Sequence, residues 1–258
     1  MAKGKDAFFH ALSILDFHSI NFQNLSTKNH WYDKIPGLIS KETNKNIENP
    51  AQRVVLEFSS DFQKLNKEGP LIILCDSSKN INQDAKIVFE ASSGEDCARL
   101  LFVSHIVCQR FAKPVVLVIS MECLENDLKF KPEHIPFPPK FVIRDKTWKP
   151  DIVKSNHPAL NFKRISFEDG KGPRDKSNLL IISHGKNSIE VNKLIENSNS
   201  KNIRHLELQT LRPISLEIIE SSMRLVEKII TTVETYKWIS EFMDIRAFEL
   251  DDIESLLK

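Results

Sequence analysis

A few histidine and carboxylate side chains stand where this sequence could place acid–base chemistry. His184 follows an apolar segment and precedes Gly185, the kind of position at which open parallel sheets bind ligands. The simpler interpretation of His184 is a turn residue. Asp76 also ends an apolar segment, so it could face a ligand crevice or cap a following helix. His105 lies inside an apolar helical pattern and is expected to be a core or interface histidine.

The metal-ligating residue types do not form a convincing metal site. His10 and His18 are eight residues apart and would share roughly one helix face, but no Cys or carboxylate at i+4 completes a ligand set. No two cysteines form a CxxC pair, so structural zinc, an iron–sulfur site and a disulfide framework are not expected. We interpret the four cysteines as buried thiols in a reducing compartment: Cys75, Cys97, Cys108 and Cys123. We expect this chain alone to bind no metal.

Glycine is scarce, which argues against a nucleotide-binding loop. The chain has 7 glycines among 258 residues, whereas average usage is about 7%. Glycine lets a backbone turn with positive φ or approach a phosphate closely. No GxGxxG, GxxxxGK[ST] or GxSxG motif occurs. The sequence therefore predicts poor binding of a phosphate group by this chain alone.

Charge and hydropathy exclude two further classes of protein. The formal net charge is +1, so we do not expect a nucleic-acid binder. The longest apolar runs, such as residues 114–119, are far shorter than the roughly 20 residues that a membrane span needs. The first residues have no apolar stretch typical of a secretory signal. We expect an intracellular protein, in the cytoplasm or an organelle matrix, without membrane insertion.

The elements that would position these side chains begin with a βαβ pattern. Continuous apolar runs flanked by turn residues predict buried parallel strands. A helix over 97–111 follows an N-cap signal at residues 92–96. A helix is also expected over 6–20, and Pro50 could open another that runs to Phe58. The predicted strands are 69–76, 86–90 and 114–120.

The second half of the chain repeats the β/α alternation after a Pro-rich stretch. Most of the twelve prolines lie within 125–173, which predicts a linker without regular core elements. Strands are expected over 178–183, 203–208 and 228–234, and helices over 188–196, 216–225 and 239–258. The predicted fold class is α/β, with two parallel-sheet domains. The expected boundaries are a first domain at 1–124, a linker at 125–176 and a second domain at 177–258.

The order of these segments resembles a known superfamily. Residues 178–185, 205–214 and 228–234 are similar to the carboxyl-terminal domain of the transketolase superfamily, and the match over 209–213 (Gln-Thr-Leu-Arg-Pro) is the most specific. Upstream segments resemble the thiamine-pyrimidine-binding domain of 2-oxoacid:ferredoxin oxidoreductases, most of all the large subunit of indolepyruvate:ferredoxin oxidoreductase. These upstream segments are 69–76, 82–84, 89–96 and 113–118.

The resemblance implies a subunit of a thiamine-diphosphate-dependent enzyme that decarboxylates 2-oxoacids. In that family a glutamate hydrogen-bonds the aminopyrimidine ring and helps to form the ylid. One alignment puts Gln52 at this position, and a looser one puts Glu48 there. Gln cannot take up the proton, so the first alignment implies that ylid formation is severely impaired. The resemblance also assigns Asp76, Gln83 and Asp84 to cofactor binding.

Two parts of the family pattern have no counterpart in this chain. Nothing resembles the diphosphate-binding segment or the ferredoxin-like cysteine clusters. Thiamine diphosphate is therefore expected only at an interface with a partner, if it binds at all. Our first hypothesis is a divergent, non-catalytic or accessory subunit within a larger complex. The second is an active pyrimidine-domain subunit that pairs with a separate diphosphate-binding chain. A third is relation to the beta subunit of the 2-oxoacid dehydrogenases.

Both domains of this superfamily bury surface against other subunits, so the resemblance predicts protein partners, in a homodimer or a heteromeric complex. Exposed apolar patches are expected on the helix over 97–111 and near the end of the chain. The candidate interface residues are Phe102, His105, Trp238, Phe242 and Phe248.

Overall fold

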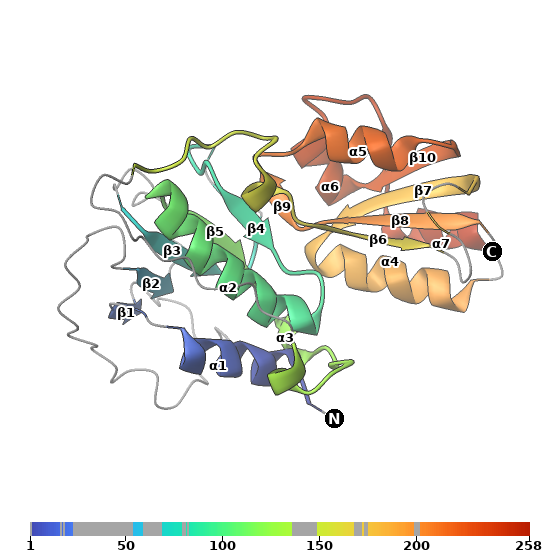
Figure 1. Ribbon diagram of the computed structural model, residues 1–258. Helices are drawn as coiled ribbons and strands as arrows, with labels where there is room; N and C mark the ends of the chain where they lie inside the picture. Colours follow the sequence, from blue (N-terminus) through green and yellow to red (C-terminus); the bar gives the residue numbers. More distant parts are fainter. Residues whose placement is uncertain are drawn as a thin grey trace.

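The fold is described from a computed structural model. Two β-sheets lie side by side, and helices pack on both (Figure 1). Among the described residues, no helix combines the length and the apolar composition that crossing a bilayer requires. The structure describes residues 2–15, 17, 19–22, 54–58, 69–78, 81, 83–135, 149–167, 172, 175–198 and 202–258.

The first sheet has six strands in the order β1-β2-β3-β5-β4-β9, and all of them except β9 pair in parallel. Its central strands are runs of aliphatic residues buried on both faces, as parallel sheets require. The three strands predicted over 69–76, 86–90 and 114–120 are confirmed. The strands are β1 (Ser19–Phe22), β2 (Val55–Phe58), β3 (Leu71–Cys75), β4 (Val88–Glu90), β5 (Val115–Val118) and β9 (Thr210–Arg212).

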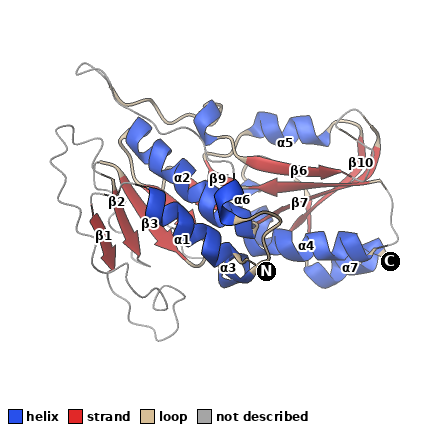
Figure 2. Cartoon of the chain, turned by 60° about the horizontal axis from the view of Figure 1, so that its bottom comes forward, coloured by secondary structure: helices blue, strands red, loops and turns tan. Residues whose placement is uncertain are grey.

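Helices α1 (Gly4–Ile14), α2 (Gly94–Phe111) and α3 (Met121–Glu125) accompany this sheet. Helix α2 confirms the predicted N-terminal signal, because the Ser93 Oγ accepts a hydrogen bond from the Asp96 backbone N–H at 3.3 Å. Helix α1 packs alongside α2 (Figure 2).

Two of the predicted interface residues lie on α2 and are wrong as surface residues. Phe102 is 3% exposed and His105 is 7% exposed. The His105 ring stands edge-on to that of Phe17, with 5.3 Å between the ring centroids. The chain's own packing therefore covers this face, and His105 is a core histidine, as its apolar surroundings in the sequence indicate.

The second sheet has five strands in the order β11-β10-β7-β8-β6, with only β6 antiparallel. Alternate residues of β7 enter different cores. Ile181 packs with residues of α4 and α7, whereas Leu180 and Ile182 pack with residues of α5 and α6. The elements are β6 (Lys163–Phe167), β7 (Ser177–His184), α4 (Gly185–Asn197), β8 (Ile203–Leu208), α5 (Leu216–Met223), β10 (Val226–Thr232), α6 (Val233–Ile239), β11 (Arg246–Phe248) and α7 (Leu250–Leu257).

Some sequence-based assignments differ from the structure. The expected helix from Pro50 to Phe58 is wrong where it is described, because Val55–Phe58 forms β2 between β1 and β3. The expected helix over 239–258 is interrupted: 246–248 adds the edge strand β11, and apart from Ile239, which ends α6, only 250–257 is helical. A short apolar run suits either a helix or a strand, and here pairing with a neighbouring strand decides.

The stretch predicted to be a linker without regular core elements contains a strand. Lys163–Phe167 forms β6, which pairs antiparallel with β8 at the edge of the second sheet. This pentapeptide contains no proline, so the argument against strands does not apply to it. Where this stretch is described, it also contains two single 3-10 turns, at Pro132–His134 and Pro158–Leu160. The division into domains and linker stays a prediction.

The two sheets are joined by packing and by pairing. Strand β9 follows β8 of the second sheet but pairs with β4 of the first. One hydrophobic cluster contains Ile73 and Val116 from the first sheet together with Ile182 and Leu206 from the second. This docking brings the carboxyl end of β4 close to that of β7.

Candidate functional site

A cleft lies where the carboxyl ends of parallel strands from both sheets meet. We call it the carboxyl-end cleft, and its volume is about 300 Å³. Each side chain that lines it follows or ends a strand, or stands in the first turn of a helix. Ligands of open α/β sheets bind at such ends. The lining residues are Asp76, Ser77, Ser78, Glu90, Ser120, Met121, Glu122, His184, Lys186, Asn187 and Glu234.

A buried glutamate and a buried histidine face one another in this cleft. The Nε2 of His184 lies 3.3 Å from the Oε2 of Glu90, without the alignment of a hydrogen bond. The other ring nitrogen, Nδ1, is hydrogen-bonded to the Thr235 Oγ1 at 2.7 Å. Burial raises the pKa of Glu90 to about 8 and lowers the pKa of His184 to about 4. At neutral pH the pair is therefore an uncharged carboxylic acid beside a neutral imidazole.

Gly185 makes room for this arrangement. Its φ is +55°, a conformation that glycine adopts without strain. A Cβ at this position would lie 2.1 Å from the Glu90 Oε1, which is a steric clash. The Glu90 carboxyl group thus packs directly against the first residue of α4. Any side chain at position 185 would force the Glu90 side chain to move.

The structure brings some of the sequence-predicted site residues together. Asp76 and His184 line the carboxyl-end cleft, as their positions after strands indicate. Gln83 lines two neighbouring cavities instead, and Asp84 lines none of these three. Glu48 and Gln52 lie outside the described residues, as does His18.

The described residues do not form a metal centre. Among them, no three His, Cys, Asp or Glu side chains are grouped as metal ligands would be. The four predicted buried thiols are buried, and burial raises the pKa of each of them. Thiols in this state are poor nucleophiles.

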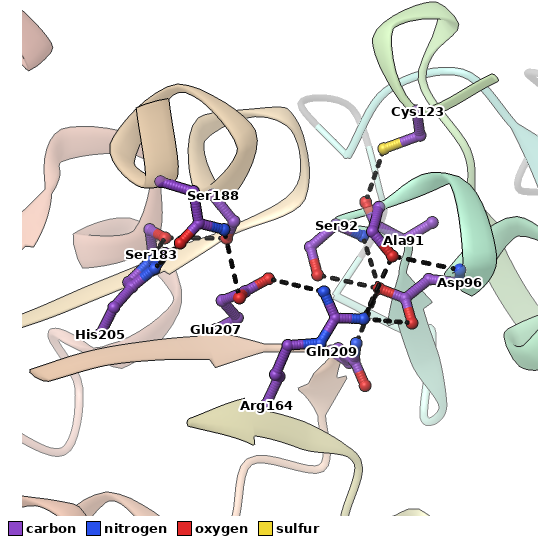
Figure 3. Close-up of polar contacts among 12 residues, drawn as sticks. Ala91, Ser92, Asp96, Cys123, Arg164, Ser183, Ser188, His205, Glu207 and Gln209 are labelled. Carbon is purple, nitrogen blue, oxygen red and sulfur yellow. Dashed lines mark hydrogen bonds and ion pairs between the residues drawn. The ribbon is translucent and has the colours of Figure 1, made fainter. Parts of the chain in front are cut away.

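A second polar cluster, missed from the sequence, joins the sheets inside the protein (Figure 3). Its centre is Asp96, which is completely buried. The Asp96 carboxylate accepts hydrogen bonds from the Arg164 guanidinium at 3.1 Å and from the Gln209 Nε2 at 2.8 Å. Arg99 donates to the same carboxylate at 2.9 Å. Burial opposes ionisation of Asp96, but Arg164 and Arg99 outweigh it and hold its pKa below the usual range.

This cluster continues into the second sheet. The Glu207 carboxylate lies 3.6 Å from Arg164 and accepts a hydrogen bond from the Asn192 Nδ2 at 3.3 Å. The His205 Nδ1 is 2.8 Å from the Asn192 Oδ1, and its Nε2 is 2.6 Å from the Ser183 Oγ. Ser, His and Asn in this order resemble a nucleophile, a base and an orienting group. Ser183 and His205 are completely buried, however, so no substrate reaches them.

Sequence signals for these two clusters were present but weak. Asp96 matches an acidic residue in the first turn of a helix, which is ordinarily exposed. Arg164 lies in the stretch predicted to be a linker, so nothing connected it with Asp96. Glu90 ends a predicted strand, and Gly185 begins a helix in a chain with few glycines. Only the docking of the sheets shows that these pairs meet.

The carboxyl-end cleft does not fit a diphosphate group. Four carboxylic acids line it, and the one lysine, Lys186, has a half-exposed side chain. Carboxylates hold a diphosphate only through a metal ion, and the described residues contain no ligand group for one. This cleft by itself therefore presents a diphosphate with a single cationic side chain, that of Lys186, among four carboxyl groups.

Comparisons with known proteins place the fold. No family model and no curated protein matches the sequence. The structure is similar to a 2-oxoglutarate:ferredoxin oxidoreductase from Magnetococcus marinus, solved with 2-oxoglutarate, coenzyme A and succinyl-CoA bound. The TM-score is 0.65 and the identity 11%, and the match covers 98% of this chain and 64% of that one.

A second similar structure is a split-gene transketolase in an inactive β4 tetramer. Here the TM-score is 0.55 and the identity 12%, over 96% of this chain and 88% of that one. Such low identities show the fold alone. The chain thus has the paired α/β architecture of transketolase-like proteins, and it spans only 64% of the length of the oxidoreductase chain.

Proposed function

We propose that this protein is a divergent, accessory subunit related to the thiamine-diphosphate-dependent 2-oxoacid oxidoreductases, and that it works inside a larger complex. The observation that carries the proposal is the extent of the match. Almost the whole chain, 98%, is similar to 64% of the oxidoreductase chain, so both of its sheets have counterparts there while the rest of that chain has none here.

The chemistry of the chain supports an accessory role. Its carboxyl-end cleft is acidic and lacks a ligand group for a metal among the described residues. In one of the two possible alignments, Gln52 stands at the position of the family glutamate. Thiamine diphosphate is accordingly proposed to bind only at an interface with a partner chain, if this chain takes part in binding at all.

The alternative is an active pyrimidine-domain subunit of an indolepyruvate- or pyruvate-type enzyme. The similarity to a split-gene transketolase favours it, because that protein was solved as an inactive β4 tetramer of one of its chains. A chain of the same extent would become active only with its complementary chain. In this version Glu48 takes the role of the family glutamate.

Isolation of the native complex tests the proposal. The tagged chain is purified under native conditions from cells that express it at its normal level, and mass spectrometry of the intact complex gives its composition. We expect a stoichiometric complex with a chain that carries a metal–diphosphate segment. Recovery of the 29.7 kDa chain by itself would contradict the proposal.

A further inference from the structure

A larger cavity lies next to the carboxyl-end cleft, and we call it the Trp238 cavity. Its volume is about 460 Å³, within the range of about 300–1,000 Å³ typical of small-molecule sites. Four parts of the chain meet there: the segment before β4, residues 153–155, β9 with the turn that follows it, and the end of α6 with the residues after it. Its apolar lining consists of Ala85, Val153, Leu211, Pro213, Ile214, Leu216, Trp238 and Phe242.

Trp238 provides a flat apolar wall. Its indole ring is partly buried, and the Arg212 guanidinium lies over it, with the Cζ 5.0 Å from the ring centroid. Phe242, one turn further along the chain, is 50% exposed and Leu216 is 38% exposed. These exposed apolar side chains share one cavity. A bound molecule with an apolar surface would remove them from contact with water.

Cations outnumber acids around this cavity. Lys86, Arg212 and Lys237 line it, against a single acid, Glu241. Burial lowers the pKa of Arg212, yet a guanidinium stays charged at any physiological pH. The Arg212 Nη1 donates a hydrogen bond to the Ala85 carbonyl oxygen at 3.4 Å, and this contact and the indole ring fix the orientation of the planar guanidinium. A guanidinium in a fixed orientation suits a carboxylate.

The neighbouring surface is acidic, so it would orient an anionic ligand in the Trp238 cavity. A third cavity, lined by Gln83, His184 and Glu234 among others, shares Arg212 and Trp238 with the Trp238 cavity. Beyond it lies the carboxyl-end cleft with its four acids. An anionic group is therefore favoured at the Arg212 end and repelled at the end lined by Asp76, Glu122 and Glu234.

We propose that the Trp238 cavity binds a small organic anion, a carboxylate with a flat apolar body. The carboxylate lies beside Arg212 and Lys237, and the apolar body packs against Trp238 and the aliphatic lining. This site is separate from any thiamine cofactor and does not depend on the proposed function.

Tryptophan fluorescence of the full chain tests the ligand class. Replacing the other two tryptophans (W31F/W148F) leaves Trp238 as the reporter, and a thermal melt checks that this variant is folded. Three probes share one phenyl body: 3-phenylpropanoate, its neutral amide and 3-phenylpropylamine. We expect saturable binding of the carboxylate, with the amide and the amine weaker by about tenfold or more. No binding of the carboxylate up to about 10 mM, or equal binding of the amine, overturns the proposal.

Charge variants locate the site. Arg212→Gln should weaken binding of 3-phenylpropanoate by about tenfold or more, and Lys237→Gln by a smaller factor. Lys193→Gln removes the same charge from the exposed face of α4, away from the cavity, and should change nothing. If Arg212→Gln fails to fold, the site is tested by comparing Lys237→Gln, a change at an exposed residue, with Lys193→Gln. Equal effects of Lys237→Gln and Lys193→Gln mean that the probe responds to net charge alone, and they overturn the assigned site.

Discussion

The Nε2 of His184 lies 3.3 Å from the Oε2 of Glu90, and the two side chains come from different sheets. Glu90 ends β4 of the first sheet, and His184 ends β7 of the second. Both are buried, so their protonation states depend on the docking of the sheets. The pair therefore links the geometry of the cleft to the pH dependence of stability.

Because Glu90 is buried, we expect the stability of the protein to fall as the pH rises toward 8. Burial raises its pKa from 4.5 to about 8, so the folded chain keeps a proton that the unfolded chain has lost. Stability then falls as the pH rises through this window. His184, whose pKa is lowered from 6.5 to about 4, has the opposite effect, but only below pH 6.5. Between pH 6.5 and 8 we expect a net loss of about 1–2 kcal/mol in the free energy of unfolding.

Urea denaturation at several pH values measures this loss, and Glu90→Gln provides the comparison. The amide cannot ionise, so the decline between pH 6.5 and 8 should disappear in this variant. Lys186 and Glu234 also line the cleft and are present in both proteins, so the difference between the two curves isolates Glu90. Parallel curves for the two proteins would show that Glu90 does not titrate in this range.

Gly185→Ala should destabilise the fold through its contact with Glu90. The new Cβ would lie 2.1 Å from the Glu90 Oε1, at a φ of +55°. We expect a cost of about 1–3 kcal/mol, part of which should vanish in a Glu90→Ala background. Gly69→Ala is the control, because a Cβ there meets nothing within 4 Å. Its cost should be the same in both backgrounds, and an unchanged cost of Gly185→Ala would argue against the contact.

Asp96 should be the most sensitive residue of the polar cluster between the sheets. Asp96→Ala removes a completely buried carboxylate and leaves Arg164, Arg99 and Gln209 without their shared acceptor. We expect a loss of about 3 kcal/mol or more in the free energy of unfolding. Glu190→Gln, which breaks an exposed ion pair on α4, should cost about 0.5 kcal/mol or less. Similar costs for the two variants would contradict the importance of the cluster.

Phe242 is the exposed member of the three aromatic residues predicted to form an interface near the end of the chain, while Trp238 and Phe248 are partly buried. Phe242 is 50% exposed, whereas the other predicted patch, on α2, is buried. Sedimentation at tens of micromolar should show a dimer or higher oligomer, and Phe242→Ser should shift it toward the monomer without changing the melting temperature by more than a few degrees. A stable monomer of 29.7 kDa would exclude self-association and leave only a heteromeric complex.

The sequence predicts the long aliphatic strands inside both sheets. Strands such as β3, β5 and β7 are continuous aliphatic runs between turn residues, and this pattern reflects burial on both faces. Most of the missed strands, β1, β6, β9 and β11, lie at sheet edges and are only three to five residues long, whereas the missed β2 lies inside the first sheet. Short edge strands carry little periodicity, and their pairing is decided by neighbours that are distant in the sequence.

The site was predictable only in part, for a related reason. His184 and Asp76 could be placed at strand ends from local sequence alone. The partners Glu90, Arg164 and Gln209 could not, because their contacts depend on how the two sheets dock. Buried polar pairs such as Asp96 and Arg164 also contradict the usual exposure of charged residues.

The most direct test of an accessory role is the rate of 2-oxoacid oxidation by the native complex after Glu48→Gln and Gln52→Ala are introduced together. These positions are the two candidates for the family glutamate. If the chain is accessory, the rate should stay within about twofold of that of the unmodified complex, since loss of a working acid–base group costs about 100-fold or more. A drop of that size, with the complex still assembled, would contradict the accessory role and establish the chain as a catalytic subunit.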